Sequence, residues 1–330
     1  MKSTERMQRL ALLLTMFASL IVLPLWPEAL EDNSRLVPGR DIADLSSGEL
    51  SIVVPEDVAP GEILRVVASG EPSVHEVELR REDGSTVATA QPIEVRTTDA
   101  ATVRVFLFGI DSRAAPGKHT LNARSESDDV LLARELMIRE RRFRSEDIAL
   151  NSALSSLRGD YDPRKVEESR LLTDLILSRD PEALHNPGPL AWPLPEDTRR
   201  TSFFGDRRTF LYSGGERASS IHAGLDLAAP VGTPVYSSGA GVVRMARSRI
   251  VTGGTVVIEH LPGVYSLYYH LDEISVDEGV DIDIGELIGT VGATGLATGP
   301  HLHWEIRVAG VPVSPEDVTK QALLFGTSAP

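Results

Sequence analysis

The sequence predicts a mainly β protein, with an antiparallel β-sheet domain preceded by a small immunoglobulin-like β-sandwich and a short helical linker. Three observations lead to this prediction. Short β-type runs between turn residues fill residues 48–140, helix-capping signals and prolines fill residues 144–200, and a glycine-rich stretch of alternating sequence fills residues 201–318. Zero cysteines in 330 residues exclude a disulfide scaffold and a thiol nucleophile.

The first thirty residues resemble an export segment. Lys2, Arg6 and Arg9 precede an apolar run from Leu10 to Trp26, which is the pattern of a signal peptide. The run is short for a transmembrane helix and no small-x-small cleavage site follows it. Residues 1–30 are therefore predicted to be a signal peptide or a membrane anchor. We expect an extracytoplasmic protein of the periplasm or cell envelope, which a retained segment would tether to the membrane.

The charge balance argues against nucleic acid as a partner. The chain has 33 basic and 48 acidic residues, for a net charge of −15. A protein that binds the phosphate backbone without sequence preference needs the opposite sign. The 42% hydrophobic and 25% charged residues are typical of a soluble globular protein.

Residues 48–140 carry β-type runs at the spacing of a small sandwich. The runs are Leu50 to Val54, Ile63 to Ala68, Val74 to Leu79, Thr102 to Phe108 and Val130 to Ile138. His75 and His119 are isolated in this region and are expected at the surface rather than at a metal. With no chemical motif, the region is predicted to be a spacer or docking domain.

Two helices are predicted within residues 144–200. Ser145 is the expected N-cap of the first helix, and Gly159 its end. Asp162 is the expected cap of the second, with Pro163 at its first position. Prolines between Pro187 and Pro195 then predict a stiff, extended linker.

Four histidines near the C-terminus fall into three short motifs. These are His222-Ala-Gly-Leu-Asp226, Tyr268-Tyr269-His270 and His301-Leu-His303. Residues two apart in a strand share a face, so His222 lies with Asp226, and His301 with His303, Glu305 and Arg307. The same rule predicts a polar face that joins Ser266, Tyr268 and His270. We expect the three polar faces to meet in a groove over an apolar core.

These residue types are the ligands of a catalytic zinc. Such a site takes three nitrogen or oxygen ligands and keeps a fourth position for water. Four histidines and one aspartate exceed that number, so the surplus would act as general base or oxyanion stabiliser, and spacing alone does not assign the roles. His260 and His185 lie outside the motifs and are expected to be structural. The sequence has no G-x-S-x-G elbow and no H-E-x-x-H motif, which excludes two other hydrolase classes.

From about Thr201 to Pro315 the sequence resembles the lysostaphin-type, or LytM-type, zinc metalloendopeptidases that cut peptidoglycan peptides. The resemblance rests on Phe204-Gly205-Asp206-Arg207, His222 to Asp226, Ala229 to Val235, Tyr268 to Leu271 and Gly292 to Glu305. It implies zinc (Zn2+) bound by His222, Asp226 and His303, with His270 and His301 as catalytic histidines. All five positions match, and relatives that lack them act as amidase activators or scaffolds.

The expected function is zinc-dependent hydrolysis of peptide bonds in peptidoglycan stem peptides or cross-bridges, for cell-wall remodelling. Two alternatives remain open. The chain could be a non-catalytic LytM-fold regulator or scaffold that activates other wall hydrolases, or a zinc amidase that cuts the sugar–peptide bond. Because cell walls are usually anionic, the acidic charge favours targeting through the β-sandwich or the tether rather than through bulk attraction.

Overall fold

The computed structural model describes residues 49–96 and 102–324, and the predicted signal or anchor at residues 1–30 lies outside these ranges. The chain divides into two units, Met1–Arg35 and Leu36–Pro330. All elements below belong to the second unit. Within the described ranges, no helix is both long and apolar enough to cross a membrane.

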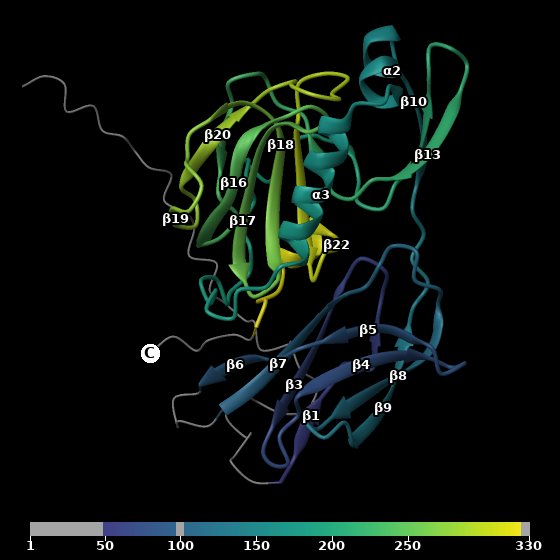
Figure 1. The fold of residues 1–330 in the computed structure, drawn as a ribbon, viewed down its shortest axis with the longest axis vertical. Coiled ribbons are helices and arrows are strands. Elements are labelled where there is room, and N and C mark those ends of the chain that lie inside the picture. The colour runs from purple at the N-terminus through teal and green to yellow at the C-terminus, as the bar shows by residue number, and fades with distance from the viewer. Residues whose placement is uncertain (1–48, 97–101, 325–330) are drawn as a thin grey trace, which may run out of the picture. The chain divides into compact units, whose positions relative to one another are not determined.

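The first part of this unit is two β-sheets that pack face to face (Figure 1). The strands are β1 (Ser51–Val53), β2 (Asp57–Val58), β3 (Ile63–Ser69), β4 (Glu76–Arg81), β5 (Thr86–Ala90), β6 (Ile93–Arg96), β7 (Thr102–Gly109), β8 (Gly117–Arg124) and β9 (Val130–Ile138). One sheet has the order β1-β3-β7-β6 and the other β2-β9-β8-β4-β5. Val66 and Phe106 of the first sheet meet Val77 and Leu121 of the second in one apolar core. A β-sandwich is the architecture that the sequence predicts here, and its immunoglobulin-like character stays a prediction.

The two histidines of this sandwich differ in exposure. His75 is exposed as expected, whereas the prediction of an exposed His119 is wrong. His119 is buried, and its Nδ1 lies 3.1 Å from the carbonyl oxygen of Gly117. A local backbone contact thus satisfies the ring, which single-residue polarity did not reveal.

The linker begins with a strand rather than a helix. Ser145–Ala149 forms β10, which pairs in parallel with β12 (Arg207–Leu211). The helix α2 (Ser152–Gly159) starts later, where the Asn151 side chain accepts the amide of Leu154. The prediction of a helix from Ser145 is therefore wrong at its start, because pairing with a distant strand outweighs the local capping pattern.

The second predicted helix is confirmed at its start. The helix α3 (Pro163–Leu177) has Asp162 as its N-cap, and that side chain accepts the amide of Arg164. Pro163 occupies the first turn, where its missing amide hydrogen is not needed.

The C-terminal part is built on a ten-stranded, mainly β architecture. Its strands are β11 (Arg200–Ser202), β14 (Leu225–Leu227), β15 (Pro234–Tyr236), β16 (Gly241–Arg249), β17 (Gly253–Leu261), β18 (Val264–Ile274), β19 (Asp281–Ile282), β20 (Leu287–Val291), β21 (Leu302–Val308) and β22 (Val311–Val313). The main path is β11-β14-β21-β18-β17-β16-β19, and every pair is antiparallel. A short helix, α4 (Pro315–Val318), follows, and β13 (Arg217–Ile221) pairs with β12 beside the sheet.

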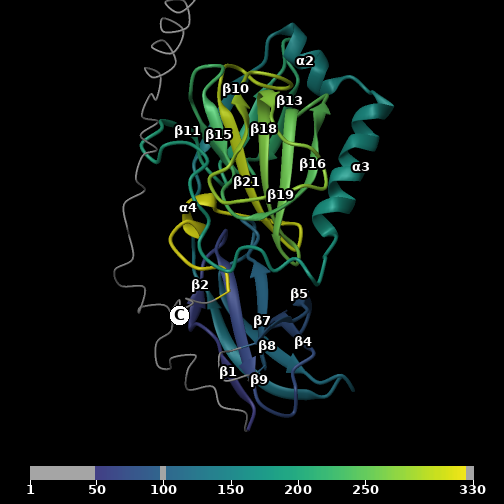
Figure 2. The same cartoon turned by 90° about the vertical axis from the view of Figure 1, so that its left-hand side faces the viewer.

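Both faces of this sheet are covered over β17 and β18. One face carries Tyr268 and Trp304 in the main apolar core. The other face carries Tyr265 and Leu267, against which α3 packs through Ile176 (Figure 2). A strand that is buried on both sides has no polar alternation for the sequence to reveal.

The predicted polar face of Ser266, Tyr268 and His270 is therefore wrong. Ser266 and Tyr268 point into the core, where the Tyr268 hydroxyl lies 2.9 Å from the Ser266 hydroxyl. His270 leaves this alternation because its φ is +62° and the β17–β18 register shifts between Gly254 and Val256. The side chain thus reaches the face opposite to that of Tyr268.

His260 has the structural role that the sequence predicts. It is fully buried, with Nδ1 2.8 Å from the carbonyl oxygen of Ala240 and Nε2 2.7 Å from the Ser266 hydroxyl. A carbonyl only accepts, so Nδ1 carries the proton and the Ser266 hydroxyl donates to Nε2. Burial lowers the pKa of His260 to about 4.

We expect acid to destabilise the fold through His260. Between pH 6.5 and 4, His260 is protonated in the unfolded chain but not in the folded protein. The free energy of unfolding therefore falls as the pH falls. Lowering the pH from 7 to 5 should cost the wild type about 2 kcal/mol more than His260→Gln. Urea titrations at both pH values measure this difference. Equal pH dependence in the two proteins, or an NMR-measured His260 pKa near 6.5, would contradict it.

Candidate metal centre

Strand pairing brings two of the predicted ligands side by side. Asp226 of β14 and His303 of β21 are direct cross-strand partners. His222 follows β13, and Gly224 returns the chain to β14. A Cβ on Gly224 would lie 2.3 Å from the carbonyl oxygen of Trp304. Only glycine fits this close approach, which explains the third position of the H-x-x-x-D motif.

The three predicted ligands converge on one point. His222 Nε2 lies 2.9 Å from His303 Nδ1 and 3.1 Å from Asp226 Oδ1, and the last two atoms are 2.7 Å apart. All three side chains are buried. Across residues 49–96 and 102–324, this is the group of three that could hold a metal ion.

The outer ring nitrogens of His222 and His303 are held by hydrogen bonds, so their other ring nitrogens face the point where the ligands meet. His222 Nδ1 lies 2.8 Å from the carbonyl oxygen of Phe203, which can only accept. Nδ1 therefore carries the proton, and burial lowers the pKa of His222 and keeps the ring neutral. His303 Nε2 faces Glu305 Oε1 at 2.9 Å, so Nδ1 is its inward atom. Two imidazole nitrogens and one carboxylate oxygen thus converge, which is a donor set that fits a divalent transition metal.

The same arrangement of ligand atoms also favours a proton on His303. Burial opposes a charge on His303, yet hydrogen bonds to Asp226 and Glu305 raise the pKa of His303 to about 9. Glu305 in turn is held by Arg307, whose Nη2 lies 2.5 Å from Glu305 Oε2. A metal ion would replace the proton on His303 Nδ1, as a cation between the same atoms.

The two remaining histidines, His270 and His301, lie beside the three ligands but are not part of the ligand group. The ring centroids of His270 and His301 are 4.8 Å apart, and that of His270 lies 6.2 Å from that of His303. His270 Nδ1 lies 2.7 Å from the carbonyl oxygen of Thr294, and His301 Nδ1 lies 2.8 Å from that of Gly299. Each ring therefore donates from Nδ1, and in the neutral form of each ring Nε2 is the acceptor.

The surroundings of His270 favour its neutral form. Its burial, together with the neighbouring His301 and His303, lowers the pKa of His270 to about 3. The ring is neutral at physiological pH, and its lone pair is available to a polarised water or substrate.

The structure thus brings all five predicted residues together and adds others that the sequence motifs did not identify. Tyr269 stacks on His303, with ring centroids 5.3 Å apart and planes 5° apart. Arg208 Nη2 lies 2.6 Å from Asp226 Oδ2. Glu305 was visible as the next alternate residue after His303, whereas no local signal marks Arg208 because its partner lies on another strand.

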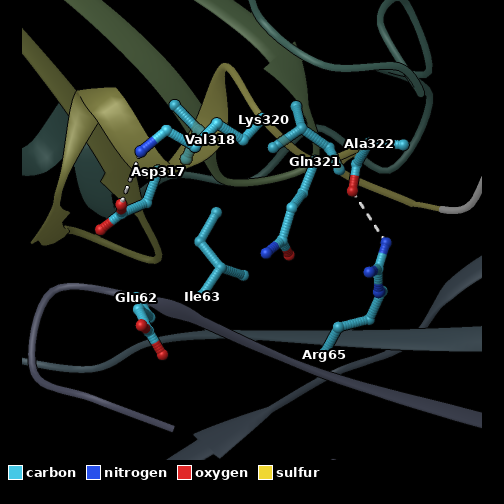
Figure 3. Close-up of a pocket in the computed structure, with 9 residues that line it drawn as sticks. Glu62, Ile63, Arg65, Asp317, Val318, Lys320, Gln321 and Ala322 are labelled. Atoms are coloured by element: carbon cyan, nitrogen blue, oxygen red, sulfur yellow. Dashed lines mark hydrogen bonds and ion pairs between the residues drawn. The ribbon is translucent and has the colours of Figure 1, made fainter. Parts of the chain in front are cut away.

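The cavity drawn in Figure 3 lies apart from these residues. It has a volume of about 100 Å³ and is lined by residues of β3 and of the C-terminal segment, among them Ile63, Arg65 and Gln321. Arg65 donates to the carbonyl oxygen of Ala322 at its edge. None of the five predicted site residues lines it.

A family comparison covers the whole histidine cluster. Residues 220–315, which contain all five predicted site residues, match the family model described as Peptidase family M23. We call residues 220–315 the M23 domain after this match. M23 enzymes are metallopeptidases, in agreement with the ligand group of the M23 domain.

Curated relatives are similar to part of the chain. The chain is 43% identical over 123 residues to the peptidoglycan DD-endopeptidase ShyA of Vibrio cholerae, covering 37% of this chain and 28% of that protein. It is 48% identical over 98 residues to the DD-carboxypeptidase/endopeptidase Mpg of Neisseria meningitidis, covering 30% of this chain and 23% of that protein. The chain thus spans about a quarter of the length of these relatives.

A solved structure shares the fold over more of the chain. A putative peptidase M23 from Pseudomonas aeruginosa aligns with a TM-score of 0.53 at 23% identity, covering 79% of this chain and 94% of that one. At this identity the match concerns the fold alone.

We expect the M23 domain to stay folded when metal is removed. Leu225, Leu302, Trp304 and Ile306 are fully buried beneath the ligands, and burying such a side chain is worth roughly 1.5–3 kcal/mol. Far-UV circular dichroism with and without a chelator should therefore show the same β spectrum, unlike a small zinc finger. The Asp226→Ala variant, which lacks a ligand, is the matched control. Loss of the β signal on chelation of the wild type would show that the metal holds the sheet together.

Proposed function

We propose that the protein is a zinc-dependent endopeptidase that hydrolyses peptide bonds in peptidoglycan stem peptides or cross-bridges. The observation that carries the proposal is the convergence of His222 Nε2, Asp226 Oδ1 and His303 Nδ1 beside the imidazoles of His270 and His301. Two nitrogens and one oxygen are the ligand set of a hydrolytic zinc site, and three protein ligands leave a position for substrate or water. Zinc is the metal that this mixed set favours.

The chain's own residues would divide the chemistry as follows. Bound zinc supplies Lewis acidity toward a scissile carbonyl and acidifies water. His270 and His301, each with Nδ1 fixed by a backbone carbonyl, present Nε2 as an acceptor. One of the two would take the proton of the attacking water and pass it to the leaving amine, and the other would support the developing oxyanion.

Peptidoglycan as the substrate is supported by the relatives. ShyA and Mpg are named for endopeptidase activity, ShyA expressly on peptidoglycan. Because the chain spans about a quarter of each, the substrate of the whole protein belongs to the proposal. An extracytoplasmic location, with residues 1–30 as signal or tether, would place the enzyme with this substrate.

A digest of purified sacculi tests the proposal. Peptide–peptide cleavage leaves stem peptides linked to sugar, whereas an amidase releases them, and mass spectrometry of the muropeptides separates the two. We expect zinc-dependent products with sugar-linked stems and about one zinc per chain. Released intact stems would make the protein an amidase. Zinc without any cleavage would favour a non-catalytic regulator.

A further inference from the structure

Asp226 has two carboxylate oxygens with different surroundings. Oδ1 faces His222 and His303. Oδ2 faces Arg208, whose Nη2 lies 2.6 Å away. The Asp226 side chain is 9% exposed and that of Arg208 14%, so solvent weakens this ion pair little. One oxygen is therefore free for a metal while the other is already bound.

Arg208 is itself held by a residue from the linker. Its Nε lies 2.6 Å from Glu146 Oε1, and that oxygen also accepts the Ser202 hydroxyl at 2.5 Å. Glu146 and Arg208 are register partners in the parallel pairing of β10 with β12. Strand pairing thus sets their side chains next to each other, and the Arg208 fork joins the two carboxylates.

We infer that Arg208 and Glu146 are a positioning pair that makes Asp226 a one-oxygen metal ligand. With Oδ2 bound to Arg208, Asp226 offers the metal Oδ1 alone. A carboxylate that gave both oxygens would fill the position that a hydrolytic metal keeps for water or substrate. The inference rests on the metal site proposed above and concerns residues that precede the M23 domain match at 220–315.

The charges of the three groups explain why Glu146 belongs to the pair. Arg208 alone beside Asp226 would draw negative charge away from the metal. Glu146 balances the guanidinium, so that Glu146, Arg208 and Asp226 together keep one net negative charge. Glu146 therefore acts only through Arg208, and β10 supplies a part of the metal centre that residues 220–315 lack.

Zinc affinity of the full chain tests the pair without relying on activity. We expect Arg208→Met and Glu146→Gln each to raise the dissociation constant for Zn2+ about 10- to 100-fold in competition with a chromophoric chelator. For Arg208→Met, the loss of a fixed Asp226 Oδ1 is expected to outweigh the removal of a positive charge. The double variant should be no weaker than Arg208→Met, because Glu146 has no path to the metal without Arg208. Asp147→Asn is the matched control, since Asp147 lies next to Glu146 on β10 but pairs with exposed Arg217.

Melting temperatures of the metal-free variants separate positioning from folding. A metal-free Arg208→Met that melts near the wild type while binding Zn2+ more weakly supports the pair. Zn2+ affinities within threefold of the wild type, or tighter than it, would overturn the pair, as would additive effects in the double variant. A wild type that binds no Zn2+ would defeat the proposed function, whereas a zinc-binding wild type with unaffected variants defeats only this inference.

Discussion

Asp226→Ala and His303→Ala should each lose zinc and almost all peptidoglycan cleavage. Either change removes one of the three converging ligand atoms and leaves two, which is too few for a hydrolytic zinc site. Several kcal/mol of transition-state stabilisation go with the metal, so cleavage should fall at least about a thousandfold. Metal analysis and muropeptide release on the same preparations measure both effects.

Matched variants keep this result specific. His75→Ala removes an exposed histidine of the β-sandwich, and Asp277→Ala removes an exposed carboxylate of the C-terminal part. Both should keep about one zinc per chain and full cleavage. Full zinc occupancy in Asp226→Ala or in His303→Ala would remove that residue from the ligand set.

His270→Ala should keep its zinc and lose at least about a hundredfold in cleavage. Its ring lies beside His301 and His303 but outside the three-atom ligand group. A general base or oxyanion donor contributes about 10²- to 10⁴-fold in rate without holding the metal. Turnover, bound zinc and melting temperature of one preparation test this expectation together.

The alternative outcomes assign His270 differently. Near-normal turnover per folded molecule, with a lowered melting temperature, would make His270 a packing residue. Zinc loss would make it a ligand. His260→Gln is a useful comparison, because His260 is buried in the same sheet but bonded only within the core.

The candidate site could be predicted from the sequence because its motifs are local. His222 and Asp226 lie four residues apart, and His301 and His303 two apart, so each pair is visible as a short motif. The sandwich and the β-rich C-terminal part were predictable for the same reason, from turns and short apolar runs.

What the sequence could not reveal depends on pairing between distant segments. Ser145 and Glu146 have the pattern of a helix start, yet β12 captures them as a strand. The face of β18 that carries Tyr268 was predicted to be polar, but it packs in the main core. The opposite face of β18 is covered by α3, so both faces are apolar. Arg208 has no motif at all, since its role comes from Asp226 across the fold.

Loss of the imidazole at position 270 would be easy for this fold to tolerate. The backbone there is left-handed, with a φ of +62°, a conformation that costs residues with a Cβ roughly 1–2 kcal/mol. Glycine, which has no Cβ, adopts it without this cost. A His270→Gly change would thus relieve the main chain while removing the imidazole. Backbone stability alone would favour glycine here, so a histidine in this conformation supports the catalytic role proposed for His270.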